Sequence, residues 1–329
     1  MKIPWRLKVL AKAWLPDSWL KKYQKNIQRK AAAARKKARE EALREFGPLT
    51  PSELSARLKE FDLGEAPSLF VHSSFNDLFT FTGSPLNVLE ILLNLVGEHG
   101  TLFMPAFSTN TFVNPPRLFD VKTEPTYTGI VNEIFRRRPG VVRSLHPRHS
   151  ICGLGPAAEE VLSGHEKCLR ADGPDSPFDR LRLENNSWIL TLGCTPVYLS
   201  FLHWVDDIEP EKWPFPVHVS LPVTAMVKDA DDRLIEVADW PIRPEVAATH
   251  NVYRVTDLLS PLAMNYQSYR GINLGLYHIK TLSEELLALR DKGIVHYSYK
   301  GKRYSNVVPK FKLDNQCHHQ KKPSTVLEK

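Results

Sequence analysis

Cysteine is scarce in this sequence, and its spacing gives no sign of a redox or metal site. The 329 residues contain four cysteines and no CxxC pair. This pattern argues against a disulfide framework or a zinc knuckle and indicates buried free thiols in a reducing compartment. Cys152 and Cys194 lie in apolar, strand-like runs, so we expect inert core thiols there rather than nucleophiles.

Long apolar runs and several common enzyme motifs are also absent. No stretch of about 18 apolar residues occurs, so no membrane-spanning helix is predicted. Lys8 and Lys12 interrupt the apolar start of the chain, which disfavours a secretory signal. GxSxG, GxGxxG and GxxxxGKS/T do not occur in a strand-to-helix setting. Serine hydrolase, dinucleotide-binding and P-loop functions are therefore disfavoured, and a cytoplasmic location is expected.

Positive charge is concentrated at the start of the chain. Residues 1–46 contain fourteen Lys or Arg and four Asp or Glu, a net charge of +10. Because the whole chain carries +7, the remainder carries −3. Three tryptophans among lysines precede a helix-favouring run at 31–44. Such an arm fits peripheral contact with an anionic inner membrane surface, or packing on its own body or a partner subunit in a homo-oligomer. Nucleic-acid binding is the reading we favour least.

The body of the chain has an alternating strand and helix pattern. Helices are predicted at 51–60 and 85–96, and short apolar runs predict strands at 68–72 and 101–105. Strand, helix and strand in succession predict an α/β fold with a mixed, largely parallel central sheet flanked by helices. The expected division is a basic amphipathic helical arm (1–46), one large domain (47–310) and a polar, frayed tail (311–329).

Polar residues gather where ligands bind in such folds, at the carboxyl ends of strands. One stretch is unusually rich in titratable and anion-binding side chains: Arg143, Ser144, His146, Arg148, His149 and Ser150. This composition points to a charged or phosphate-bearing ligand, and the alternative is a solvated loop. His72-Ser73-Ser74 follows a predicted strand and would suit an oxygen-rich ligand, or simply cap a helix.

His203 and Asp206 form the most specific catalytic candidate. At a spacing of three they share one face of a helix, where the carboxylate would fix the imidazole tautomer and raise its basicity. The alternative is a surface ion pair. His146 and His149 have no third ligand nearby, so no metal site is predicted.

Taken together, these segments resemble the aminoglycoside 3-N-acetyltransferase family, which has the antibiotic N-acetyltransferase fold. No single tripeptide is decisive, but the ordered set is specific. The matching segments are 71–74 (VHSS), 97–108 (GEHGTLFMPAFS), 124–129 (EPTYTG), 133–150 (EIFRRRPGVVRSLHPRHS), 155–156 (GP), 175–178 (DSPF) and 202–206 (LHWVD).

The resemblance implies transfer of an acetyl group from acetyl-coenzyme A (acetyl-CoA) to an amine of a small acceptor, with no metal. It implies that His203 is the general base and that Asp206, where the family usually has glutamate, orients it. Donors near Ser73 or Ser144 would hold the oxyanion. Implied cofactor-binding residues are His72, Ser73, Ser74, Arg143, Ser144, His146, His149 and Ser150, and implied substrate-binding residues are Tyr127, Thr128, Ser176 and Phe178.

The sequence differs from the family pattern at positions that could affect which acceptor it binds. The family usually has a Gly-rich turn at 78–85 and an Asn-Thr pair at Leu199-Ser200, and the basic arm is outside its usual pattern. We therefore expect an amino sugar or glycan-precursor amine rather than an aminoglycoside antibiotic, although antibiotic resistance stays open. Two alternatives are open. One is an O-acetyltransferase with the same fold, and the other is a non-catalytic protein on a decayed acetyltransferase scaffold that binds a membrane or a partner.

Overall fold

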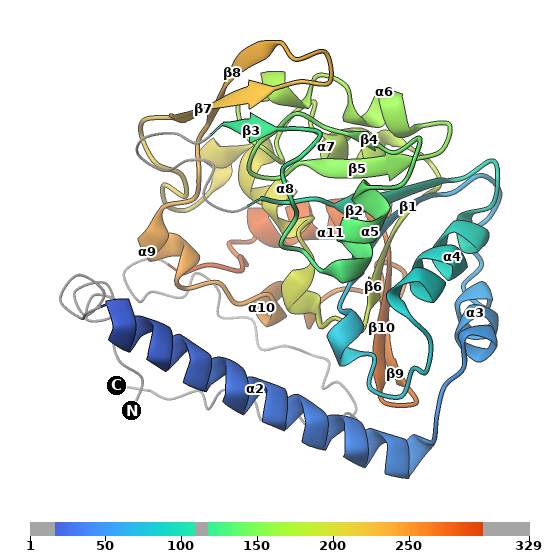
Figure 1. Cartoon of the computed structure of the whole chain (residues 1–329). Helices are drawn as coiled ribbons and strands as arrows, with labels where there is room; N and C mark the ends of the chain where they lie inside the picture. Colours follow the sequence, from blue (N-terminus) through green and yellow to red (C-terminus); the bar gives the residue numbers. More distant parts are fainter. Residues whose placement is uncertain (1–16, 109–117, 299–329) are drawn as a thin grey trace.

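A seven-stranded sheet forms the centre of the molecule (Figure 1). The structure is a computed structural model that describes residues 17–108 and 118–298; the predicted tail and the first sixteen residues of the arm lie outside this range. The strand order is β4-β5-β2-β1-β6-β10-β9. These strands are β1 Ser68–Ser73, β2 Thr101–Pro105, β4 Val142–Arg143, β5 Ile151–Leu154, β6 Ser187–Leu192, β9 Met264–Tyr269 and β10 Ile272–His278.

The sheet is mixed, as expected, but its parallel part is smaller than expected. Only the three central strands are parallel: β1 pairs with β2 on one side and with β6 on the other. The pairings of β5 with β2 and β4, and of β10 with β6 and β9, are antiparallel. The helical crossover between β1 and β2 imposes parallel pairing, whereas the β9–β10 hairpin imposes antiparallel pairing at one edge. The expectation of a largely parallel sheet is therefore corrected.

Helices cover both faces of the sheet, and alternating strand residues define two cores. Phe70, Phe103 and Ile189 point into one core, while their sequence neighbours Leu69 and Leu102 point into the other. The helices are α2 Asp17–Phe46, α3 Pro51–Lys59, α4 Pro85–Val96, α5 Ile130–Arg136, α6 Ala158–Leu162, α7 Pro177–Leu183, α8 Leu202–Ile208, α9 Pro244–Ala247, α10 Tyr253–Thr256 and α11 Ile279–Asp291, with short 3₁₀ turns at η1 Phe75–Asp77, η2 His165–Lys167, η3 Pro196–Tyr198 and η4 Pro210–Lys212.

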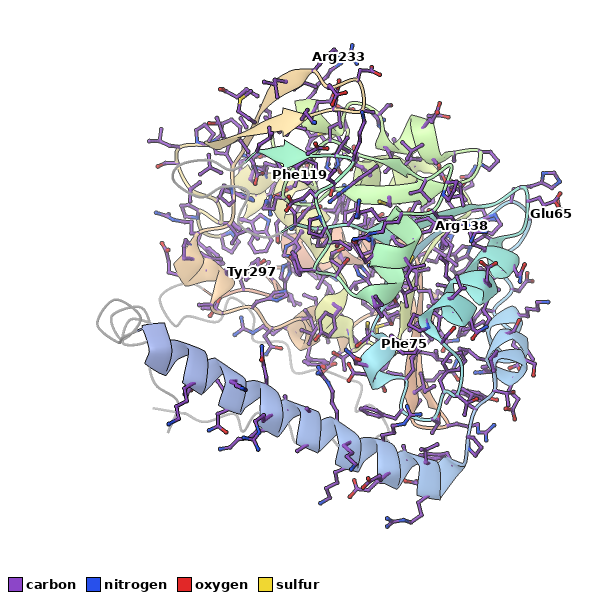
Figure 2. All side chains as sticks on the ribbon, in the orientation of Figure 1. Glu65, Phe75, Phe119, Arg138, Arg233 and Tyr297 are labelled. Atoms are coloured by element: carbon purple, nitrogen blue, oxygen red, sulfur yellow. The ribbon has the colours of Figure 1, made fainter. Side chains whose placement is uncertain are left out.

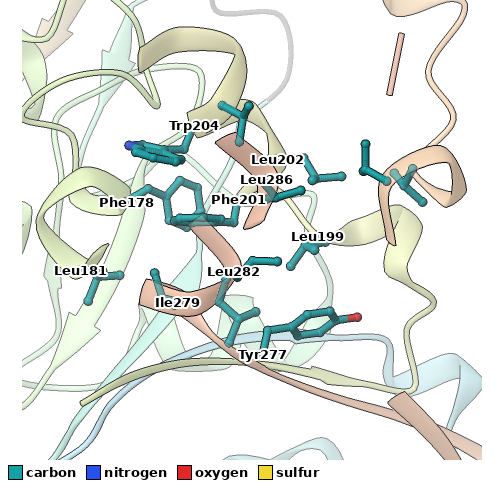
Figure 3. Packing of buried hydrophobic residues seen from close by; sticks show 14 of the residues in the cluster. Phe178, Leu181, Leu199, Phe201, Leu202, Trp204, Tyr277, Ile279, Leu282 and Leu286 are labelled. Carbon is teal, nitrogen blue, oxygen red and sulfur yellow. The ribbon is translucent and has the colours of Figure 1, made fainter. Parts of the chain in front are cut away.

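The first core, which includes residues of α7, α8 and α11, carries the segment that bears His203 (Figure 3). Phe201 stacks on Trp204 with ring centroids 5.3 Å apart, and Phe178 meets Phe201 edge-on at 5.5 Å. Since Leu202 and Val205 are also buried, His203 is the single partly exposed residue between positions 201 and 205. Apolar packing on both sides of His203 thus fixes the direction of its side chain.

A second, three-stranded sheet lies beside the first and contributes to the site. Its order is β3-β7-β8, and its strands are β3 Phe119–Asp120, β7 Val223–Lys228 and β8 Leu234–Asp239. A small core of Phe119, Val121, Val227 and Val237 holds it together. At the end of β8 the fully buried Asp239 accepts hydrogen bonds from Arg148, which ties this sheet to the histidine-rich stretch.

The helix-favouring run at 31–44 is helical and forms part of α2, which runs from Asp17 to Phe46. It crosses one end of the molecule and joins the body near the β9–β10 turn (Figure 1). Arg270 of that turn donates to the carbonyl oxygens of Phe46 and Pro48 at 2.9 and 2.8 Å. Side chains along most of α2 are exposed (Figure 2). Among the described helices, none is long and apolar enough to cross a bilayer.

Candidate active site

A histidine–aspartate pair on α8 is the centre of the candidate site. Nδ1 of His203 lies 3.0 Å from Oδ2 of Asp206, one helical turn later. The His203 side chain is 25% exposed, whereas that of Asp206 is fully buried. When Nδ1–H donates to the carboxylate, Nε2 becomes the nitrogen that can accept a proton. The pair that the sequence predicts from its spacing is therefore formed.

Asp206 is also contacted by two side chains from the end of the described chain. The Tyr297 hydroxyl donates to Oδ2 of Asp206 at 3.2 Å, and Nε2 of His296 lies 3.0 Å from Oδ1. Both residues are 2% exposed. The hydrogen bonds to Oδ2 and the imidazole beside Oδ1 favour the ionised form of a buried carboxylate, which would otherwise be costly.

The pair is polarised in the sense that a general base requires. Burial by itself would lower the pKa of His203, but the hydrogen bond and charge of Asp206 outweigh it, so the pKa lies above the usual 6.5. Burial would raise the pKa of Asp206, but His296 and His203 hold that pKa well below its usual range. Asp206 stays ionised, and its negative charge makes His203 bind a proton more readily than an ordinary imidazole does.

A second histidine–aspartate pair lies against the first. Nδ1 of His149 is 2.6 Å from Oδ2 of Asp172, and the His149 ring stacks on Phe107 with centroids 4.4 Å apart. The His149 and His203 rings are 5.6 Å apart. Burial, helped by the charge of Arg148, lowers the pKa of His149 well below its usual value, and burial raises the pKa of Asp172 to about 6. His149 is therefore a neutral ring beside His203.

The segment His72-Ser73-Ser74 lies at the end of β1, and its side chains are already partnered. Nε2 of His72 lies 3.1 Å from the Ser200 hydroxyl, and burial lowers the pKa of His72 to about 3. Ser73 donates to Asn132 at 3.1 Å, and Ser74 donates to Asp77 at 2.6 Å. The structure therefore places the three residues at a strand end, as expected, with their side chains used in internal contacts.

The charged side chain of Arg143 is likewise engaged within the protein. Its guanidinium donates to the carbonyl oxygens of Ala106 at 2.6 Å and Glu124 at 2.5 Å and to the Ser150 hydroxyl at 3.1 Å. It also lies over the ring of Phe119, 4.7 Å from its centroid. Arg143 and Ser150 thus hold neighbouring segments together, and their predicted role as direct donor contacts stays a prediction.

Ser144 and His146 are buried behind the site. The Ser144 hydroxyl accepts from the Ile151 backbone at 2.9 Å and contacts Nδ1 of His165 at 2.9 Å. His146 is fully buried and stacks on His165 with ring centroids 4.9 Å apart. Burial lowers the pKa of His146 well below its usual value. Of the two histidines in the 143–150 stretch, only His149 contacts the ring of His203.

The four predicted acceptor contacts occupy different environments. Ser176 is the N-cap of α7, accepting from the Asp179 backbone at 3.3 Å, and Phe178 is 1% exposed within the core. Thr128 donates to the Pro105 carbonyl oxygen at 2.7 Å. Tyr127 is 59% exposed and lies 6.5 Å from the Phe107 ring that stacks on His149. Tyr127 is therefore the one of the four best placed to meet a ligand.

The described residues contain no candidate metal site, and the thiols of Cys152 and Cys194 are not suited to act as nucleophiles. No cluster of three His, Cys, Asp or Glu side chains suited to a metal ion occurs there. Burial raises the pKa of Cys152 and of Cys194 to about 12, so both thiols stay protonated at neutral pH. This agrees with the prediction that they are core thiols.

Sequence reasoning missed the partners that surround the two predicted histidines. Asp172 lies in the loop between η2 and α7, and His296 and Tyr297 follow α11, far from His203 in sequence. His250 lies with its ring 6.0 Å from that of His203. None of these residues has a periodic or motif signal, because each reaches the site only through tertiary folding.

Comparison with known proteins gives a family model and several relatives. The model described as aminoglycoside 3-N-acetyltransferase matches residues 70–265. Among curated proteins, aminoglycoside N(3)-acetyltransferase IX of Micromonospora chalcea is 29% identical over 179 residues, which is 49% of this chain and 63% of the relative. The match thus spans less than two thirds of that relative's length.

Solved structures share the fold. The crystal structure of aminoglycoside acetyltransferase AAC(3)-Xa superposes with a TM-score of 0.66 at 21% identity, covering 79% of this chain and 99% of that one. The structure titled "AAC-IIIb binary with CoASH" superposes with a TM-score of 0.62 at 19% identity, covering 76% and 99%. At these identities the likeness establishes the fold.

Proposed function

Because the chain belongs to the aminoglycoside 3-N-acetyltransferase family, we propose that it transfers an acetyl group from acetyl-CoA to an amine of a small, sugar-like acceptor. The observation that carries the proposal is the His203–Asp206 pair, in which a buried ionised carboxylate raises the pKa of a partly exposed histidine. Such a pair is suited to remove a proton from a nucleophile during attack.

In the proposed reaction, the acceptor nitrogen attacks the thioester carbonyl carbon while Nε2 of His203 takes a proton from that nitrogen. The carbon–sulfur bond then breaks, and the thiolate of coenzyme A leaves and takes up a proton from His203. Asp206 stabilises the positive charge that His203 carries between these two transfers. The acceptor thereby becomes an amide, and coenzyme A leaves as a free thiol.

Acetyl-CoA is the proposed donor, and the strand ends near His72 and the 143–150 stretch are its proposed channel. A solved structure of the same fold carries coenzyme A in its title. Because Arg143, Ser144 and Ser150 bond to other parts of the protein, the stretch would act through its shape and backbone. The neutral His149 and the Phe107 ring supply an apolar wall next to His203.

We propose an amino sugar or glycan-precursor amine as the acceptor rather than an aminoglycoside antibiotic. An aminoglycoside carries several ammonium groups, and such groups form their strongest hydrogen bonds with carboxylates. The carboxylates that contact His149 and His203 are buried and already paired: Asp172 with His149 and Asp206 with His203. An acceptor with a single amine needs fewer carboxylates in the site to bind it.

Thiol release from acetyl-CoA tests this proposal. A panel of amino sugars, nucleotide-linked amino sugars and aminoglycosides should give the highest kcat/KM with an acceptor that carries one amine. A higher kcat/KM with an aminoglycoside would contradict the proposed acceptor class and leave the acetyl transfer intact. An ester product in place of an amide would contradict N-acetylation.

We propose that the enzyme is cytoplasmic and that its basic arm attaches it peripherally to an anionic membrane surface. Lys22, Lys25, Arg29 and Lys30 of α2 are exposed. Each basic residue near such a surface contributes about 1 kcal/mol. Changing these four residues to Gln should therefore weaken binding to phosphatidylserine-containing vesicles by about two orders of magnitude or more.

A matched control keeps the charge at the same positions, with Lys22, Lys25 and Lys30 changed to Arg and Arg29 changed to Lys. This variant should bind like the wild type, and neither protein should bind neutral phosphatidylcholine vesicles. Unchanged vesicle binding by the Gln variant would contradict membrane attachment and favour packing of the arm on a partner subunit.

A further inference from the structure

The segment that follows α11 returns to the candidate active site. After Gly293, residues 294–298 enter the first core, where Ile294, Val295 and Tyr297 are buried. Figure 2 labels Tyr297 inside the body, on the side of α9. The family model matches residues 70–265, so this segment lies outside the matched range. Nothing in the family match therefore assigns it a role.

Hydrogen bonds fix the segment against the chain that carries His250. The Asn251 backbone donates to the His296 carbonyl oxygen at 2.8 Å. The Ser298 backbone donates to the Thr249 hydroxyl at 2.8 Å, and that hydroxyl donates to the Ser298 carbonyl oxygen at 2.9 Å. Backbone contacts on both sides of His296 and Tyr297 hold the two side chains in place. These contacts therefore fix where the side chains of His296 and Tyr297 lie.

Both side chains are directed at Asp206. The Tyr297 hydroxyl lies 3.2 Å from Oδ2, the same oxygen that His203 contacts, and 3.5 Å from Nδ1 of His203. His296 approaches the other oxygen, Oδ1, with Nε2 at 3.0 Å. Asp206 is fully buried, so these protein groups take the place of water around the carboxylate.

We propose that Tyr297 and His296 are positioning residues that hold Asp206 ionised and oriented and limit how strongly it draws a proton onto His203. The inference rests on the proposed function, in which His203 is the base. A carboxylate that shares its charge among three partners stabilises a neighbouring imidazolium less than one bound to the imidazole alone. His203 consequently stays able to release the proton to the leaving thiolate.

Several other groups also shift the pKa of His203. Its pKa is raised by Asp206 and by the charge of Asp172, and it is lowered by burial and by Arg148. The rings of His149 and His250 lie 5.6 and 6.0 Å from the His203 ring. The His250 ring also packs against the rings of His296 and Tyr297, at 5.3 and 5.2 Å between centroids. Tyr297→Phe keeps the aromatic ring beside His250, so a shift in the titration of His203 in this variant reports on the partners of the carboxylate.

The test is an NMR titration of the His203 ring in the full-length chain, with the resonance assigned by comparison with His203→Gln. Tyr297→Phe keeps the ring in the core and removes the hydroxyl donor. It should raise the pKa of His203 by about 0.5 to 1 unit, the scale expected for loss of one hydrogen bond. His296→Leu should raise it in the same direction, and His296→Gln, which retains an N–H donor, should shift it less.

Tyr277→Phe is the matched control, because Tyr277 is a buried tyrosine of the same core. It should leave the pKa of His203 unchanged. An unchanged pKa in folded Tyr297→Phe would overturn the inference, as would an equal shift in the Tyr277 control. The titration requires no acceptor, so it distinguishes failure of this inference from failure of the proposed acetyl transfer, which thiol release measures separately.

Discussion

Replacing His203 with Ala should lower the rate of acetyl transfer by about 10²- to 10⁴-fold, the usual contribution of a general base. The reason is that no other described side chain combines partial exposure with a neighbouring ionised carboxylate in this way. His149, the nearest alternative, has a pKa held well below its usual value and is a poor proton acceptor. Steady-state thiol release with a good acceptor measures the loss.

The variant should remain folded, because the His203 side chain is partly exposed and its neighbours Leu202 and Trp204 carry the packing. His99→Ala serves as the control, since His99 is an exposed histidine at the end of α4. It should keep wild-type turnover. Near-normal turnover by folded His203→Ala would contradict the assignment of His203 as the base.

Replacing Asp206 with Asn should lower kcat by about 10³- to 10⁴-fold, the scale seen when the carboxylate of a serine-protease triad is replaced by its amide. The amide removes the charge that raises the pKa of His203 and can donate to Nδ1, which would move the ring proton to Nε2. His203 would then present a donor where the reaction needs an acceptor. The pKa of His203 should fall in the same variant.

Asp206→Glu is the conservative partner of this experiment. It retains the negative charge, and glutamate is the residue that the family resemblance leads us to expect at this position. Asp206→Glu should recover most of the activity that Asp206→Asn loses. Equal loss of activity in both variants, with the fold intact, would show that the buried site requires the aspartate for its size rather than its charge.

The central part of the fold could be predicted from local sequence signals. Thr50 and Ser84 precede prolines and form capping boxes at the starts of α3 and α4, as the cap pattern indicates for α3. β1 and β2 are buried on both faces, as their short, mostly apolar runs of residues indicate. The β9–β10 hairpin was missed because Met264–Tyr269 is polar and only partly buried, so it lacks an apolar strand signal.

The candidate site was predictable only where its residues are close in sequence. The His203–Asp206 pair follows from helical spacing, and the structure confirms the contact. The polar composition of 143–150 predicts ligand contacts, and this stays a prediction. In the structure Arg143 donates to the Ala106 carbonyl oxygen and His146 stacks on His165. Tyr297 lies 91 positions from Asp206, and no local pattern could join them.

The most direct test of the account is thiol release from acetyl-CoA by the wild-type chain at neutral pH, measured with and without an amino sugar. We expect release that depends on the acceptor, together with an N-acetylated product identified by mass spectrometry. Binding of acetyl-CoA without acceptor-dependent release, across the whole panel of amines, would contradict it.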